Sequence, residues 1–121
     1  MAEIARDTDF QTRQGNWLRF RWEAMGDDDT GEPVRINHNV SDMFIEATGT
    51  FGSASLSVTG GTDPSDMNFA SMVNPSGTAI AITTDGMDAL RDAPPYIMPV
   101  TAGGTSTDID VVIWMKVAVD R

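Results

Sequence analysis

The strongest constraint on the fold is the alternation of apolar and polar side chains in residues 108–119. Successive side chains of a β-strand point to opposite faces of a sheet, so this period of two predicts a strand with one buried face. Residues 16–25 alternate in the same way and predict a second strand of this kind. The residues predicted to face the core are Leu18, Phe20, Trp22, Ile109, Val111, Ile113, Met115, Val117 and Val119.

Segments rich in Gly, Pro, Asp and Asn separate the remaining apolar stretches. These residues favour turns, because Gly tolerates positive φ, Pro fixes φ, and Asp and Asn bond to nearby backbone. The strands predicted between these turns lie near residues 34–37, 43–47, 53–59, 67–73, 79–82 and 96–101. The pattern predicts an all-β fold of about eight short antiparallel strands, a β-sandwich or a jelly-roll-like barrel.

Two stretches depart from this strand-and-turn pattern. Residues 83–90 are predicted to hold at most one short helical turn, which Pro94 and Pro95 prevent from continuing. Residues 1–15 have mixed charges and little apolar periodicity, so they are predicted to form an N-terminal arm. Residues 16–121 then form a single β-sandwich domain, a size that is typical of one domain.

The sequence offers little for catalysis. It has no Cys and a single His, His38, which stands between two Asn residues. A Ser–His–Asp triad needs a nucleophile on a sharp turn beside the His, and no G-x-S-x-G motif is present. The pair Gly60-Gly61 lacks the Lys-Ser/Thr that completes a phosphate-binding loop. We therefore expect no enzymatic activity and no cofactor.

The run Asp27-Asp28-Asp29 is the main candidate for a metal site, because calcium prefers closely spaced oxygen ligands, and Asp63 and Asp66 form a second acidic turn to which the same reasoning applies. The spacing does not fit the register of an EF-hand loop, however. Adjacent carboxylates in a turn are more often simply solvated, so we expect no metal site here.

The charge balance restricts the partners that we expect. Eight Lys and Arg stand against eighteen Asp and Glu, for a formal net charge of −10. Such a surface repels phosphate backbones and anionic lipid, so we expect neither nucleic acid nor membrane as a partner. The polar residues 1–10 predict no secretory signal.

Some apolar residues fall on the strand faces opposite the predicted core. Trp17 lies opposite Leu18, while Val112 and Trp114 make the second face of the C-terminal strand partly apolar. A strand that is apolar on both faces must be covered on both sides, which predicts a subunit contact, hypothetically with copies of the same chain. A sugar-stacking platform is the alternative for the Trp residues. The candidate interface residues are Trp17, Val112, Trp114, and Phe10 and Arg13 of the arm.

From about residue 49 the order of short motifs resembles a family of small phage structural proteins encoded among head genes. The segments that carry the resemblance are Gly49–Val58, Met67–Phe69, Asn74–Ala79, Thr83–Met87 and Tyr96–Thr105. Phe69 replaces a Trp that relatives usually carry after G-S-N-D-G, and Met98 replaces an Arg that they often have before Pro.

This resemblance implies a β-fold and a virion protein. Within that class we expect a capsid decoration (cement) protein that is assembled in the host cytoplasm and located on the outer surface of the capsid. Its expected partners are the major capsid protein shell and itself, as a homotrimer at a symmetry axis. A carbohydrate-binding module for host attachment and a tail or head-to-tail component are the alternatives.

Overall fold

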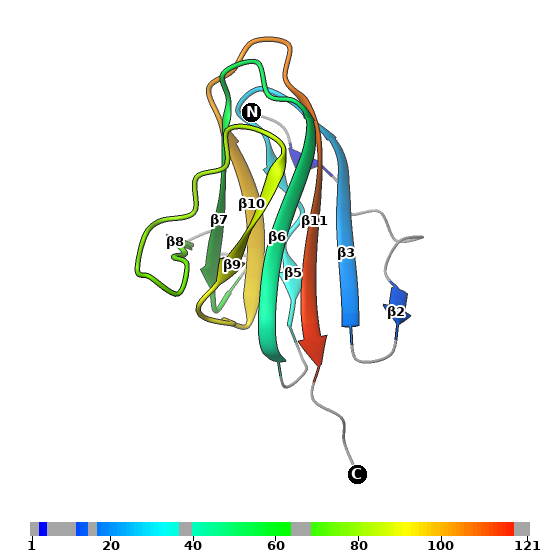
Figure 1. The fold of residues 1–121 in the computed structure, drawn as a ribbon, viewed down its shortest axis with the longest axis vertical. Coiled ribbons are helices and arrows are strands. Elements are labelled where there is room, and N and C mark those ends of the chain that lie inside the picture. Colours follow the sequence, from blue (N-terminus) through cyan, green and yellow to red (C-terminus); the bar gives the residue numbers. More distant parts are fainter. Residues whose placement is uncertain (1–2, 5–11, 15–16, 37–39, 64–68, 118–121) are drawn as a thin grey trace.

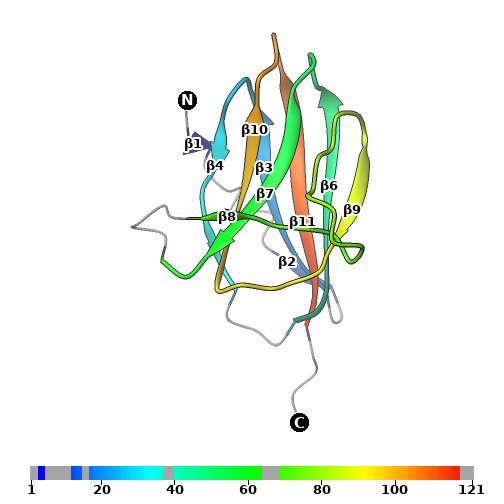
Figure 2. The ribbon, with the colours of Figure 1, turned by 90° about the vertical axis from the view of Figure 1, so that its left-hand side faces the viewer.

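The computed structural model describes residues 3–4, 12–14, 17–36, 40–63 and 69–117, and within these ranges every regular element is a strand. The strands form two sheets that face each other around one apolar core (Figures 1 and 2). The predicted all-β sandwich is therefore confirmed. The described ranges also contain no helix long and apolar enough to cross a membrane.

The first sheet has five strands in an antiparallel arrangement, and it holds both of the strongly alternating segments. Its order is β2 (Thr12–Gln14), β3 (Trp17–Met25), β11 (Asp108–Val117), β6 (Val40–Thr50) and β9 (Gly86–Leu90). The long strands β3, β11 and β6 lie side by side at its centre. The side chains that these strands bury are Leu18, Phe20, Trp22, Met25, Met43, Ile45, Ala47, Ile109, Val111, Ile113 and Met115.

The second sheet is built around β10 and β7. Its order is β1 (Glu3–Ile4), β4 (Thr30–Gly31), β10 (Tyr96–Ala102), β7 (Ser55–Gly61) and β8 (Ala70–Ser71), with β5 (Val34–Arg35) also on β10. Pro99 lies where β10 passes from one short neighbour, β4, to the other, β5. A residue without an N–H is tolerated there because the ladder is interrupted at that point.

Residues 83–90, where at most one helical turn was expected, contain none. Most of this segment is the strand β9, which pairs with residues 43–47 of β6 and buries Leu90 beneath the sheet. Met, Ala and Leu are good helix formers, but pairing with an existing strand outweighs such a weak local preference. The number of strands also exceeds the expected eight, since the described ranges contain eleven, and β1 pairs with β4 in parallel.

Two parts of the predicted N-terminal arm belong to the sheets. Strand β1 pairs with β4, and its Ile4 packs against the core. Strand β2 pairs with the start of β3 at the margin of the five-stranded sheet. The rest of residues 1–15 lies outside the described ranges.

Candidate functional site

The outer face of the five-stranded sheet, which points away from the core, carries large apolar side chains. As the alternation predicted, Trp22 is fully buried in the core, whereas Trp17 and Trp114 lie on the opposite face and are half-buried. Val112 is half-buried on this same face. Two of the three Trp residues thus remain accessible to a partner.

The strand order brings residues from distant parts of the chain together on this outer face. Trp114 of β11 pairs with Phe44 of β6, and Trp17 of β3 lies at the side of both rings. The ring centroids are 6.4 Å apart for Trp17 and Trp114 and 6.0 Å apart for Trp17 and Phe44. Met87 of β9 completes the group, and 60% of its surface is exposed.

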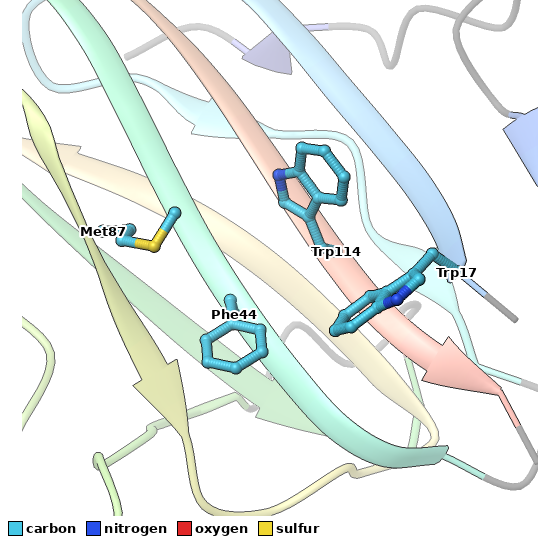
Figure 3. A pocket seen from close by; sticks show the side chains of 4 residues that line it. All are labelled: Trp17, Phe44, Met87 and Trp114. Carbon is cyan, nitrogen blue, oxygen red and sulfur yellow. The ribbon is translucent and has the colours of Figure 1, made fainter. Parts of the chain in front are cut away.

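These four side chains surround a shallow apolar cavity of about 300 Å³, which we call the aromatic hollow (Figure 3). Each comes from a different strand of the same sheet, namely β3, β6, β9 and β11. The strands fix the position of each Cα, so the shape of the hollow is a property of the sheet itself. A surface of this kind can take up apolar side chains of another molecule.

Two polar contacts hold Trp114 in place. Its indole Nε1 donates a hydrogen bond of 3.1 Å to Oε1 of Glu46, and the guanidinium carbon of Arg19 lies 5.0 Å from the ring centroid. A cation at that distance from an indole is attracted by the ring. The ring is therefore oriented before any partner arrives, which reduces the entropy lost on binding.

The acidic run 27–29 has a structural role that the sequence analysis did not anticipate. Oδ1 of Asp27 accepts a hydrogen bond of 2.9 Å from the backbone N–H of Thr107, and Oδ1 of Asp28 accepts one of 2.7 Å from Gly103. Both bonds join the β3–β4 loop to the β10–β11 loop, at the upper end of the sandwich in Figure 1.

The side chain of Asp29 forms its hydrogen bond within its own loop. Its Oδ2 accepts a hydrogen bond of 2.6 Å from the N–H of Gly26, while its backbone N–H donates to the hydroxyl of Thr101 at 2.7 Å. The three carboxylates therefore stabilise the loops by accepting backbone N–H groups. Thr107, through its side chain and its backbone N–H, holds the pKa of Asp27 below its ordinary value of 3.8.

Metal-ligating side chains are scattered over the described residues. Within them, no three His, Cys, Asp or Glu side chains are grouped so that they could hold an ion. His38, the candidate examined for catalysis, lies outside the described ranges.

The structure brings only some of the predicted interface residues together. Trp17 and Trp114 come together in the aromatic hollow, and Val112 shares their face without lining it. The backbone of Arg13 pairs with Leu18 in the β2–β3 ladder, whereas its side chain and the whole of Phe10 lie outside the description.

Sequence reasoning missed Phe44 and Met87 as members of the site. Phe44 lies in a strand that was predicted without a face assignment, and Met87 lies in the segment predicted as a helical turn. The alternation of Met43, Phe44 and Ile45 was the signal that could have placed Phe44 outward.

Comparisons with known proteins yield only distant likenesses. No protein-family model and no curated protein matches the chain. The metallopeptidase IMPa of Pseudomonas aeruginosa, solved with an O-glycopeptide, is 15% identical with a TM-score of 0.46, and the match covers 93% of this chain but only 14% of IMPa. PirA is 14% identical with a TM-score of 0.42, and 86% of this chain and 97% of PirA are covered. Protein NMB1881 of Neisseria meningitidis is 9% identical with a TM-score of 0.38, covering 88% and 79%. Likenesses at this level carry no argument about function.

Proposed function

We propose that this protein is a phage virion structural protein, a capsid decoration protein that binds the outer surface of the shell through the aromatic hollow. The motif order from residue 49 onward supports the virion class. The hollow supports adhesion to another protein. In this proposal the protein acts by binding alone and catalyses no reaction.

The single observation that carries the proposal is the position of the aromatic hollow at the surface of the sheet. The solvated face of an antiparallel sheet is ordinarily polar. Here Trp17, Phe44 and Trp114 occupy its central strands, and Met87 stands beside them. Burying one large apolar side chain of a partner in such a cavity stabilises a complex by roughly 1.5–3 kcal/mol.

The orientation of the rings favours a protein partner over a sugar. A sugar ring stacks on aromatic side chains that share a plane. The rings of Trp17 and Trp114 stand at 82° to each other, and those of Trp17 and Phe44 at 34°. This arrangement forms a concave apolar wall, which suits an aliphatic or aromatic side chain better than a flat pyranose.

Weak single contacts can produce firm attachment when many copies act together. A homotrimer at a symmetry axis would engage several shell subunits at once, and linked contacts raise the overall avidity without any new interaction. Because such a protein binds the assembled lattice and not its free subunits, it would stabilise the assembled state by mass action.

The test measures occupancy on purified capsid shells that lack the protein. Trp114→Ala is expected to reduce occupancy by more than about tenfold, because central aromatic side chains dominate interface energies. Trp114→Phe keeps an aromatic ring in place and is expected to retain part of the binding. The matched control is Arg35→Ala on the opposite sheet, where an exposed side chain is removed far from the hollow.

Full occupancy by Trp114→Ala would refute the proposed binding surface. Binding to tail or connector particles in place of shells would move the protein to that part of the virion. Selective retention on a glycan array, lost in both Trp17→Ala and Trp114→Ala, would support the carbohydrate-binding alternative instead.

Two further measurements test the oligomer and the arm. A monomer in sedimentation at micromolar concentration would count against the trimer. Deletion of residues 1–12 also removes β1 and its Ile4, so its unfolding free energy is measured beside its occupancy. Lowered occupancy with unchanged stability is expected if the arm reaches along the shell, and unchanged occupancy would reject that role.

A further inference from the structure

Strand β9 forms one margin of the five-stranded sheet and also contributes to the aromatic hollow. Among the described strands it pairs only with β6, and Figure 2 shows it at the border of the sheet, beyond β6. A strand at a sheet margin presents backbone N–H and C=O groups to which an extended peptide can add as a further strand.

The backbone contacts of β9 show which residues face away from β6. The N–H of Ala89 donates to Oδ1 of Asp88 at 2.8 Å, and the N–H of Arg91 donates to the carbonyl of Val73 at 3.0 Å. Backbone groups of alternate residues in an antiparallel strand point to the same side. The backbone of Met87 therefore also points away from β6, toward the margin of the sheet.

The outward-facing side chains of β9 lie beside the aromatic hollow. Ala89 pairs with Phe44 across the β6–β9 ladder, so its small methyl group shares the outer face with Met87, and Met87 lines the hollow on this side. A strand added beside β9 would place every second side chain on this same face. One long apolar side chain of that strand could then extend over Ala89 toward Phe44.

Asp88 determines what charge such a strand should carry. It pairs with Ile45, whose side chain points into the core, so the Asp88 carboxylate lies on the inner side of the sheet at its margin. A second copy of β9 would bring another Asp88 close to it, and like charges at such a position are unfavourable. A basic side chain would pair with the carboxylate and release the N–H of Ala89 to the incoming strand.

Other charges near this margin are already engaged. Asp85 accepts a hydrogen bond of 2.9 Å from the N–H of Gly49 through its Oδ1, and Asp92 lies 3.2 Å from Nε of Arg91. The chain as a whole carries a net charge of −10, which also favours a basic partner segment.

We infer that β9 binds an extended segment of the partner protein, in which a large apolar residue stands next to a Lys or Arg. The apolar side chain enters the aromatic hollow, the basic side chain pairs with Asp88, and the backbone adds to the sheet. This inference rests on the proposed function and names the chemistry of the segment that the hollow receives.

The test uses short synthetic peptides with alternating Val and Thr, a central Leu, and a neighbouring Lys. Their binding to the full chain is measured by fluorescence anisotropy against a Glu peptide that differs only at the Lys position. The Lys peptide is expected to bind about tenfold more tightly, the size of effect that one close charge pair produces. N-methylation of the peptide on its β9-facing amides is expected to abolish binding, because it removes the ladder donors.

Charge reversal in the protein gives the decisive control. Asp88→Lys is expected to invert the preference in favour of the Glu peptide, and Asp88→Asn is expected to remove the preference while leaving the fold intact. Equal binding of both peptides to the unaltered protein, an unchanged preference in Asp88→Asn, or full binding of the N-methylated peptide would each overturn the inference. Shell binding that needs Trp114 but not Asp88 would overturn this inference and leave the proposed function standing.

Discussion

The acidic loop, residues 27–29, and the aromatic hollow are two surface regions. In each of them the composition suggests one role and the structure shows another. Three consecutive carboxylates resemble a ligand site, yet each accepts a backbone N–H of the protein itself. Trp17 and Phe44 resemble core residues, yet they remain partly exposed around an open cavity. A candidate site is therefore better recognised by side chains whose bonding capacity or apolar surface is still unused than by the chemical type of those side chains.

The difference has a physical origin. A carboxylate that accepts a hydrogen bond from an N–H group contributes to stability, and its oxygens have less remaining capacity to bind an ion. The rings of the hollow contact one another but stay partly exposed, and only contact with another apolar surface would remove the rest of their area from water. Substitutions in the acidic loop should therefore lower stability more than substitutions in the hollow.

The largest effect on stability is expected at Asp29, the buried member of the acidic loop. Asp29→Ala leaves the N–H of Gly26 without its acceptor, and a charge-assisted hydrogen bond of this kind contributes about 2 kcal/mol. Urea denaturation measures the loss of unfolding free energy. Asp28→Ala, at an exposed position, should cost clearly less, and equal losses at the two positions would contradict the distinction.

A smaller effect is expected at the two indoles of the hollow. Trp17→Ala and Trp114→Ala should each lower the free energy of unfolding by about 1 kcal/mol, since edge-to-face pairs contribute about that much beyond burial. The double variant should lose less than the sum of the two, because both substitutions remove the same contact. Strict additivity would show that the rings do not stabilise each other.

The pH dependence of stability should reflect the contact between Asp27 and Thr107. Because the pKa of Asp27 is lowered in the folded protein, its contribution is present above the ordinary value of 3.8 and is lost as the pH falls through the folded pKa. The thermal midpoint of the unaltered protein should therefore exceed that of Asp27→Asn at neutral pH, and the gap should narrow below about 3.8. A difference in thermal midpoint that stays constant with pH would show that this contact does not produce the pH dependence.

The smallest effect, none within error, is expected from calcium. Hydrogen bonds already occupy carboxylate oxygens of the loop. The thermal midpoint should therefore be the same in millimolar calcium as in the presence of a chelator. A clear rise with calcium would mean that the loop rearranges to hold an ion, and the contrast between the two regions would fail.

The sequence predicted the central strands well because their pattern is local. Leu18, Phe20 and Trp22 alternate with polar residues and are buried as expected, and residues 109–115 follow the same rule. The strand within residues 83–90 was missed because nothing within the segment indicates its partner strand. Only the ladder with β6 decides its conformation.

The aromatic hollow could be predicted only in part. Trp17 and Trp114 were placed on the outer faces of their strands from alternation alone. Their contact depends on β3 and β11 being neighbours, and the addition of Phe44 and Met87 depends on β6 and β9 following in that order. Strand order is a long-range property that the spacing of residues along the chain does not encode.

Hydroxyl-radical footprinting of the protein, free in solution and bound to capsid shells, tests the central claim most directly. Met87, Trp17 and Trp114 line an exposed apolar cavity and react readily with radicals when they are accessible. Binding is predicted to protect these three side chains and to leave partly exposed residues of the opposite sheet, such as Tyr96 at the start of β10, unchanged. Protection confined to the opposite sheet or to the acidic loop, with the hollow as reactive as before, would contradict the account.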